Sequence, residues 1–149
     1  MMRLVLIDNR AHKWFGAMAD TTISGLNYLL KSPHKKVVLT NRALEFVPEL
    51  ILAHISLVKL DLRNNRLTQL THQLSRLSHL AELNLSGNRI QHLARVDQLE
   101  LPSLRVLHLF NCQIESIGNE FFSSFPNLLR LNLTRGLFSD YIYTDNKNS

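Results

Sequence analysis

An eleven-residue pattern of leucines recurs along most of this chain, and it constrains the fold more than any other feature of the sequence. Residues 57–67 read LVKLDLRNNRL and residues 80–90 read LAELNLSGNRI, so both have the form L-x-x-L-x-L-x-x-N-x-L, with isoleucine in the last place of the second copy. The same pattern can be laid over residues 34–44, 104–114 and 128–138. The copies start at 34, 57, 80, 104 and 128, which are 23, 23, 24 and 24 residues apart. This regular spacing predicts a stack of equivalent structural units.

The spacing within each copy has a direct structural meaning. Leu60 and Leu62 are separated by one residue, so in a strand both point to one face while Asp61 points to the other. The chain must turn after this strand, and buried backbone groups in the turn need hydrogen-bond partners. The side chains of Asn65 and Asn88 each carry amide donors and a carbonyl acceptor. We therefore predict a ladder of buried side chains at this place in the stack.

The pattern resembles the leucine-rich repeat family, whose repeats are roughly 20–29 residues long and hold Asn or Cys in the ninth place. Cys112 holds that place in the fourth copy and joins Asn65 and Asn88 in the predicted ladder as a small buried residue. Arg42 and Gly136 depart from the pattern in the first and last copies, where repeat arrays are commonly atypical. The resemblance implies an α/β leucine-rich-repeat solenoid of the intracellular type, with a curved parallel sheet and short helices or irregular segments on its outer side.

The repeat pattern leaves the N-terminal part of the chain unexplained. We divide the chain into a capping segment at 1–33, a leucine-rich-repeat domain at 34–138 and a tail at 139–149. In the cap, residues 3–7 predict a short strand, and a helix is expected between Asp20 and Pro33. Trp14 and Phe15 are expected to pack within this cap, with an exposed binding element as the alternative.

The segments between the copies predict short helices or helical turns on the outer side of the stack. Leucines 70, 74 and 77 recur at helical spacing, as do Ile117, Phe121, Phe122 and Phe125. Prolines at 48, 102 and 126 mark places where a helix cannot continue. The last copy has no complete outer segment, so its strand leucines need a cover. The tail with Tyr141, further chain, or a second copy of the molecule could each supply it, and the apolar spacing of the tail favours the first.

Composition indicates a folded chain of one domain in a reducing compartment. Its 149 residues are 45% hydrophobic and 19% charged, which excludes an intrinsically disordered chain. No apolar run approaches the ~18 residues that cross a bilayer, and Asp8 interrupts the apolar run at 4–7 too early for a secretory signal. A single cysteine cannot form the disulfide-bonded caps common in extracellular members of the family. We expect a cytoplasmic or nuclear protein with no membrane partner.

No motif for catalysis, cofactor binding or metal binding occurs in the sequence. Phosphate-binding loops, dinucleotide fingerprints, nucleophile elbows and zinc-protease motifs are all lacking, and the seven histidines are scattered. His54 lies in a mostly apolar stretch and is expected at the edge of the core. Cys112 is expected to be a buried structural cysteine and not a nucleophile. The sequence therefore predicts a protein that is not an enzyme, with no cofactor and no metal.

The face of the strands that points away from the core is the surface that repeat proteins of this kind offer to partners. We predict a partner-binding surface made of Lys36, Lys59, Asp61, Arg63, Glu82, Asn84, Arg89, His108, Phe110, Arg130 and Asn132. Val38 is expected to point outward as well. The five repeat copies carry ten Lys or Arg and only two acids, whereas the remaining chain carries seven bases and ten acids. This segregation predicts a basic concave face, and Phe110 beside His108 is its aromatic feature.

These features predict a non-catalytic protein-interaction module or adaptor whose partner is an acidic or phosphorylated protein. Nucleic acid is a second class of acidic partner, but the lack of an aromatic row at base-stacking intervals disfavours single-stranded nucleic acid. Self-association through the last repeat is the remaining alternative partner. A different class of function is also consistent with the repeats: the chain could be the recognition domain of a larger enzyme or bacterial effector whose catalytic part lies elsewhere.

Overall fold

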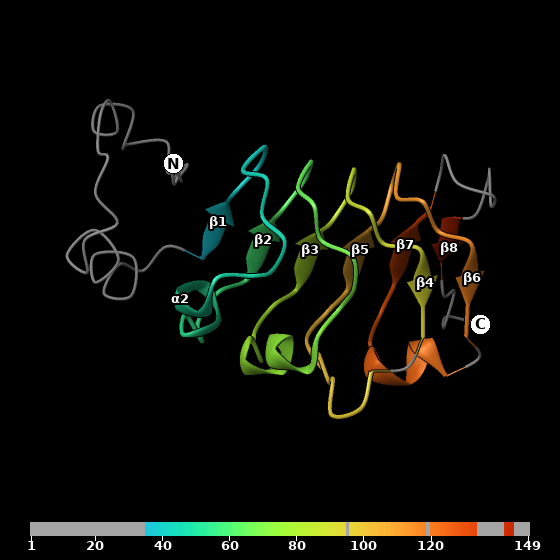
Figure 1. The fold of residues 1–149 in the computed structure, drawn as a ribbon. Helices are drawn as coiled ribbons and strands as arrows, with labels where there is room; N and C mark the ends of the chain where they lie inside the picture. The colour runs from blue at the N-terminus through green and yellow to red at the C-terminus, as the bar shows by residue number, and fades with distance from the viewer. Residues whose placement is uncertain (1–34, 95, 119, 134–141, 145–149) are drawn as a thin grey trace.

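The computed structural model describes residues 35–94, 96–118, 120–133 and 142–144. Five short parallel strands form one sheet in chain order: β1 (Lys36–Val38), β2 (Lys59–Asp61), β3 (Glu82–Asn84), β5 (Val106–His108) and β7 (Arg130–Asn132). Their first residues are spaced 23, 23, 24 and 24 apart, as the repeat pattern predicts. Figure 1 shows the strands side by side in a single row, with connecting loops at one end and helical turns at the other. The predicted α/β solenoid is therefore confirmed.

The register of the sheet explains why the leucine pattern repeats. Leu60 is aligned with Leu83, Leu83 with Leu107, and Leu107 with Leu131. Each of these side chains is at most 1% exposed, because the middle residue of every strand points into the interior. The backbone pairing continues one residue past the strands, where the Leu62 N–H donates to the Asn84 carbonyl oxygen at 2.8 Å.

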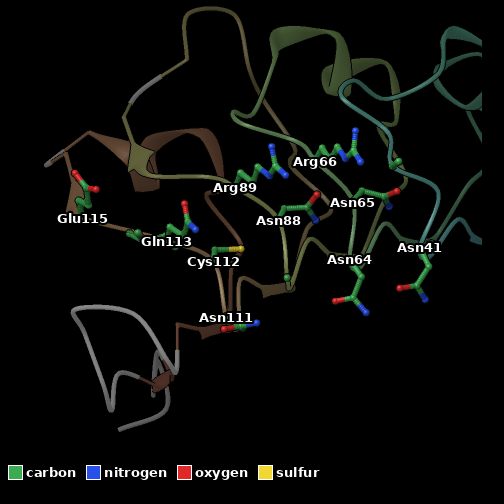
Figure 2. Close-up of a pocket in the computed structure, with 13 residues that line it drawn as sticks. Asn41, Asn64, Asn65, Arg66, Asn88, Arg89, Asn111, Cys112, Gln113 and Glu115 are labelled. Atoms are coloured by element: carbon green, nitrogen blue, oxygen red, sulfur yellow. The ribbon is translucent and has the colours of Figure 1, made fainter.

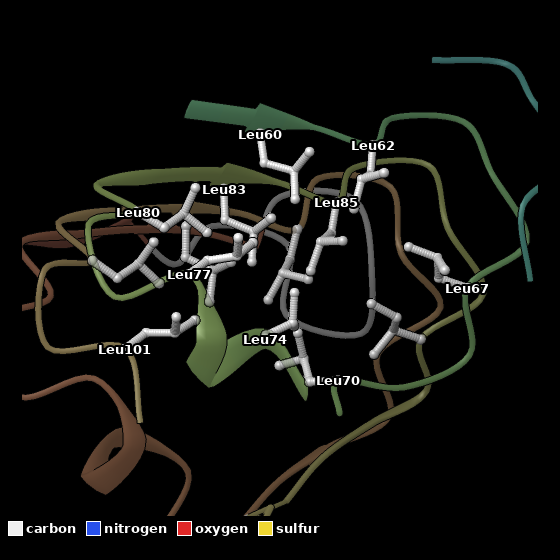
Figure 3. Packing of buried hydrophobic residues seen from close by; sticks show 14 of the residues in the cluster. Leu60, Leu62, Leu67, Leu70, Leu74, Leu77, Leu80, Leu83, Leu85 and Leu101 are labelled. Atoms are coloured by element: carbon white, nitrogen blue, oxygen red, sulfur yellow. The ribbon is translucent and has the colours of Figure 1, made fainter. Parts of the chain in front are cut away.

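The core is one continuous row of leucines between the sheet and the outer segments. Figure 3 shows Leu60, Leu62, Leu83 and Leu85 from the strand side facing Leu74 and its neighbours from the outer side. All of them belong to a single buried cluster that continues through the other repeats. No repeat encloses a core of its own, so each depends on its neighbours for burial.

The outer side holds short helices of different types and a second small sheet. Helix α2 spans Glu49–Leu52, and the 3-10 helices η1 and η2 span His72–Arg76 and Phe121–Ser124. Pro48, which we expected to interrupt a helix, instead precedes the first turn of α2, where its missing N–H costs nothing. Between the third and fourth outer segments, β4 (His92–Leu93) pairs with β6 (Ser116–Ile117) in parallel, which the sequence did not predict.

The two ends of the main sheet differ. After the last repeat, β8 (Ile142–Thr144) pairs antiparallel with β7, so the backbone of the predicted tail extends the sheet. The predicted cap at 1–33 and the deviating residue Gly136 lie outside the described residues. At the opposite end Arg42 is half-buried, and its backbone N–H donates to the side chain of Asn65.

Candidate partner-binding surfaces

The outward residues of the strands form ordered rows across the sheet, which we call the strand face. Register aligns Lys36, Lys59, Glu82, Val106 and Arg130 in one row, and Val38, Asp61, Asn84, His108 and Asn132 in the next. Arg63, Ser86 and Phe110 each lie two residues beyond the ends of β2, β3 and β5. These rows bring together ten of the eleven residues that the sequence predicts for partner binding.

The charges of the strand face largely neutralise one another. The Lys59 ammonium lies 2.6 Å from the Glu82 carboxylate of the next strand. Within one repeat, the Arg63 Nε and Nη2 atoms donate to the two Asp61 carboxylate oxygens at 2.9 and 2.8 Å. This side-chain hydrogen bonding, and then the attraction between the opposite charges, raises the pKa of the Arg63 guanidinium above its ordinary value. Both acids of the face are therefore matched by bases of the same face.

This pairing leaves the strand face less basic than the count of charges over the repeats predicts. Within the described part of the chain, the strand-face bases that make no ion pair are Lys36 in β1 and Arg130 in β7, at opposite ends of the five parallel strands. The charge count could not show this, because it treated bases on other surfaces, such as Lys35 and Arg105 before the strands, as part of the face. The middle of the strand face carries polar and aromatic groups in place of net charge.

The aromatic group in this middle region is Phe110, which is 38% exposed. Its backbone N–H donates to the Ser86 hydroxyl oxygen at 3.2 Å, and this bond fixes the position of residue 110 next to the third repeat. His108, two residues earlier on β5, is half-buried, and its neighbours in the register are Asn84 and Asn132. An exposed ring surrounded by polar groups is a common anchor for a protein partner.

Val38 and Arg89 differ from the other residues predicted to face outward. Val38 lies in the outward row, since its register partner is Asp61, but its side chain is only 7% exposed. Burial of an apolar side chain is favourable wherever a cover exists, and strand alternation alone cannot exclude one. Arg89 does not belong to the strand face: β3 ends at Asn84, the chain turns at Gly87 with φ of +70°, and Arg89 lies beyond that turn.

Arg89 lies on a second surface, formed where the chain leaves the strands, which we call the loop edge. The loop edge lines a hollow of about 990 Å³. Three parallel rows of residues contribute to it: Asn41, Asn64, Gly87 and Asn111; then Asn65, Asn88 and Cys112; then Ala43, Arg66, Arg89 and Gln113. Figure 2 shows the arginines on one side of the middle row and Asn41, Asn64 and Asn111 on the other.

The middle row of the loop edge binds the backbone of adjacent repeats together. Asn65 Oδ1 accepts hydrogen bonds from the N–H groups of Arg42 and Leu44, at 2.9 and 3.1 Å, and its Nδ2 donates to the Leu39 and Leu62 carbonyl oxygens at 2.8 Å. Asn88 has the same arrangement one repeat later, accepting from the Leu67 N–H and donating to the carbonyl oxygens of Leu62 and Leu85. Both side chains are buried, so these bonds occupy groups that water cannot reach.

Cys112 occupies the equivalent place in the fourth repeat. Its thiol is buried and donates to the Leu85 carbonyl oxygen at 3.3 Å. Burial raises the pKa of this thiol, and hydrogen bonds from the backbone of Asn88 and Gly87 oppose the shift without reversing it. A thiol held in its neutral form is a poor nucleophile, which disfavours a catalytic role.

The first row of the loop edge is the feature that sequence reasoning missed. Asn41, Asn64, Gly87 and Asn111 all have positive φ, between 53° and 70°. Asparagine and glycine tolerate this conformation better than other residues. A repeated Asn or Gly directly before the ninth place of the first four copies was the available signal, and it predicts a row of carboxamides that is interrupted at Gly87.

The described residues hold no group of three or more His, Cys, Asp or Glu side chains that could bind a metal ion. His54 is buried, and its Nδ1 lies 3.3 Å from the Ser56 hydroxyl oxygen. In the same part of the chain, no helix is long and apolar enough to cross a membrane.

The strands of successive repeats pair in parallel and in register, and a ladder of buried side chains joins the repeats. These features define a repeat solenoid, a class of fold that commonly serves protein interaction. Profiles of the leucine rich repeat family match residues 55–114 and 103–128. The chain belongs to the leucine-rich repeat family. This fold is typically non-catalytic, and the residues assigned to the strand face and the loop edge remain candidates.

Similar proteins share the repeats over part of their length. The chain is 32% identical over 114 residues to leucine-rich repeat serine/threonine-protein kinase 1 of Caenorhabditis elegans, covering 68% of this chain and 4% of the kinase. It is 38% identical over 77 residues to acidic leucine-rich nuclear phosphoprotein 32 family member A of Drosophila pseudoobscura pseudoobscura, covering 49% of this chain and 29% of that protein. The chain therefore spans less than a third of the length of either relative.

Solved structures with the same fold include internalin C2 of Listeria monocytogenes, which is 28% identical with a TM-score of 0.55 and matches 69% of this chain and 43% of that chain. A chain of the Drosophila Toll–Spatzle complex is 30% identical with a TM-score of 0.56, and the match covers 64% of this chain and 13% of that chain. Both comparisons support the solenoid architecture.

Proposed function

We propose that this chain is a protein-interaction module, acting as an adaptor, that binds a protein partner on its strand face around Phe110 and His108. The observation that supports this proposal is the exposed Phe110 ring on the open strand face, with polar residues beside it. Large aromatic side chains supply much of the binding energy when a partner covers them, and a polar rim then excludes water. A Toll chain with this fold is part of a complex with Spatzle, which is consistent with protein binding.

The partner is proposed to be acidic or phosphorylated. Lys36 and Arg130 make no ion pair with the described residues, and we propose that they interact with its anionic groups. Lys59 and Arg63 are already paired with Glu82 and Asp61, so a partner would have to compete for them. Electrostatic attraction at the two ends of the face would raise the association rate more than the affinity. We place this interaction in the cytoplasm, with the nucleus as the alternative, on the evidence of a single, buried cysteine.

A second function, as the recognition region of a larger enzyme, is supported by the kinase relative. The match with that kinase covers 4% of its length. In such a protein the strand face would bind the same class of partner, and chemistry would take place in another domain. Measuring the length of the full gene product distinguishes the two proposals.

Two phenylalanines of equal exposure allow a matched test of the strand face. Phe110 lies on the strand face and is 38% exposed, whereas Phe122 lies in η2 on the outer side and is 39% exposed. Proteins captured from a cell lysate by the parent chain would be quantified against the variants Phe110→Ala and Phe122→Ala. We expect a set of captured proteins to be lost with Phe110→Ala and kept with Phe122→Ala. Loss with both variants, or with neither, would contradict a binding site at Phe110, provided both variants melt as cooperatively as the parent.

A further inference from the structure

Arg66 and Arg89 occupy equivalent places in adjacent repeats and lie side by side on the loop edge. The Arg66 N–H donates to the Leu44 carbonyl oxygen at 2.7 Å, and the Arg89 N–H donates to the Leu67 carbonyl oxygen at 2.8 Å. These bonds place the backbone of residue 89 directly against that of residues 66–67. Because neighbouring strands of the sheet are about 4.8 Å apart, the two guanidinium groups can contact one small ligand together. Figure 2 shows both side chains pointing the same way out of the ladder.

Among the residues that the structure describes, no acidic group neutralises either guanidinium. Both side chains are exposed, and in the described part of the chain neither takes part in an ion pair. This contrasts with Lys59 and Arg63 on the strand face, whose charges are matched. Two like charges one repeat apart repel each other, so an anion between them relieves a repulsion as well as forming hydrogen bonds.

The loop edge therefore favours a different ligand from the strand face. We propose that Arg66 and Arg89 form a binding site for a phosphate monoester. A protein partner would carry this group as phosphoserine or phosphothreonine. Each planar guanidinium offers paired N–H donors that match phosphate oxygens in a bidentate geometry. A phosphate monoester carries close to two negative charges at neutral pH, which balances two guanidinium groups, whereas a single carboxylate would leave one charge unmatched. Glu115, the acidic residue that lines the hollow in the described part of the chain, lies near its far end. The repulsive group is thus separated from the proposed site.

The neighbouring carboxamides favour a peptide over a nucleic acid as the carrier of the phosphate. Asn64 and Asn111 are exposed, and side-chain amides both donate and accept hydrogen bonds. A peptide backbone also has donors and acceptors, whereas the sugar-phosphate backbone of DNA presents acceptors alone. No aromatic residue lines the described part of the hollow, so bases would find no surface on which to stack.

Nuclear magnetic resonance of the full chain tests this proposal through the side-chain Nε–H signals of the arginines. The probe is the peptide Gly-Ser-pSer-Ser-Gly, compared with its unphosphorylated form, with Gly-Ser-Glu-Ser-Gly and with inorganic phosphate. We expect saturable shifts at Arg66 and Arg89 with the phosphopeptide, and binding at least about tenfold weaker for the unphosphorylated and Glu peptides. Shifts that are equal at all exposed arginines, or that do not saturate, would overturn the site.

Variants with the same change of charge separate a specific site from general attraction. Arg66→Gln with Arg89→Gln should weaken phosphopeptide binding by about tenfold or more. Lys35→Gln with Arg105→Gln removes two exposed bases that lie outside both surfaces, and it should leave binding within about twofold. Equal weakening by the two double variants would contradict the proposal. Phe110→Ala should leave this binding unchanged, so the site and the strand-face proposal can fail independently.

Two further measurements identify the ligand. The second pKa of a phosphate monoester is about 6, so affinity for the phosphopeptide should fall as the pH is lowered from 7 to 5. A carboxylate ligand has a pKa near 4 and would keep its affinity over that range. Inorganic phosphate should bind more weakly than the phosphopeptide. Equal affinity for the two would overturn the peptide part of the proposal, and displacement of the peptide by a short single-stranded oligonucleotide at lower concentration would assign the site to nucleic acid instead.

Discussion

The side chain of Asn64 lies directly over Gly87, its counterpart in the next repeat. A Cβ atom added at residue 87 would lie 2.2 Å from Asn64 Oδ1, which is closer than van der Waals contact permits. Positive φ by itself does not explain the glycine, since Asn41, Asn64 and Asn111 adopt the same conformation. Glycine at position 87 is thus explained by the neighbouring asparagine as well as by the turn.

We expect Gly87→Ala to destabilise the protein by about 1–3 kcal/mol, because it combines a strained φ with a clash against Asn64. In the background of Asn64→Ala the clash is absent, so Gly87→Ala should cost less there. Urea unfolding of the parent, both single variants and the double variant measures this coupling as a mutant cycle. If the two substitutions are additive, the contact between residues 64 and 87 does not constrain the loop.

Asn88→Ala should destabilise the fold by about 1–3 kcal/mol. The substitution leaves the buried Leu67 N–H without its side-chain acceptor. It also removes one side-chain donor from each of the Leu62 and Leu85 carbonyl oxygens, which keep Asn65 and Cys112 as donors. Asn65→Ala should have an effect of similar size for the same reason. Thermal melts of both variants are compared with that of Gln69→Ala, an exposed polar residue of the intervening segment. Unchanged midpoints in both asparagine variants would refute the ladder as a source of stability.

The parallel sheet could be predicted from the sequence because its cause is local and repeated. Leu60 and Leu83 stand in identical surroundings, so one register satisfies every repeat at once and a shifted register would expose the whole row. The sequence predicts the outer side only coarsely, as short helices or helical turns. Leu74 and Phe121 are buried in short 3-10 helices, which agrees with that prediction. Their segments differ in sequence, so no repeated pattern specifies a common structure.

The electrostatic character of the surfaces required the three-dimensional register. Lys59 and Glu82 are 23 residues apart and become partners only because β2 and β3 are aligned in parallel. Arg66 and Arg89 have the same separation but lie beyond the strands, on a different surface. Counting charges over the repeats therefore could not show which surface carries the unpaired bases.

Cys112 provides a prediction about pH. Burial raises the pKa of its thiol in the folded protein above that in the unfolded chain, which is about 8.5. Below this value the thiol is neutral in both states and its contribution to stability is fully present. As the pH rises above it, the unfolded chain loses a proton that the folded chain retains, so the contribution is lost. The stability difference between the parent and Cys112→Ala, measured by urea unfolding from pH 7 to 10, should therefore shrink, by at most about 1.4 kcal/mol per pH unit. A constant difference over this range would contradict the assignment of a buried neutral thiol.

Adjacent phenylalanines of η2 give a final, sharply divided prediction. Phe121 is 1% exposed and its ring contacts Phe125 edge-on, with ring centroids 5.1 Å apart. Phe121→Ala should therefore cost about 3–5 kcal/mol, through lost burial and the cavity that remains. Phe122 is 39% exposed and its ring contacts Phe121 at a centroid distance of 5.3 Å, so Phe122→Ala should cost only about 1 kcal/mol. Urea unfolding measures both. The helical spacing in the sequence does not distinguish the two rings. Equal losses of stability in the two variants would show that η2 is rotated differently against the core.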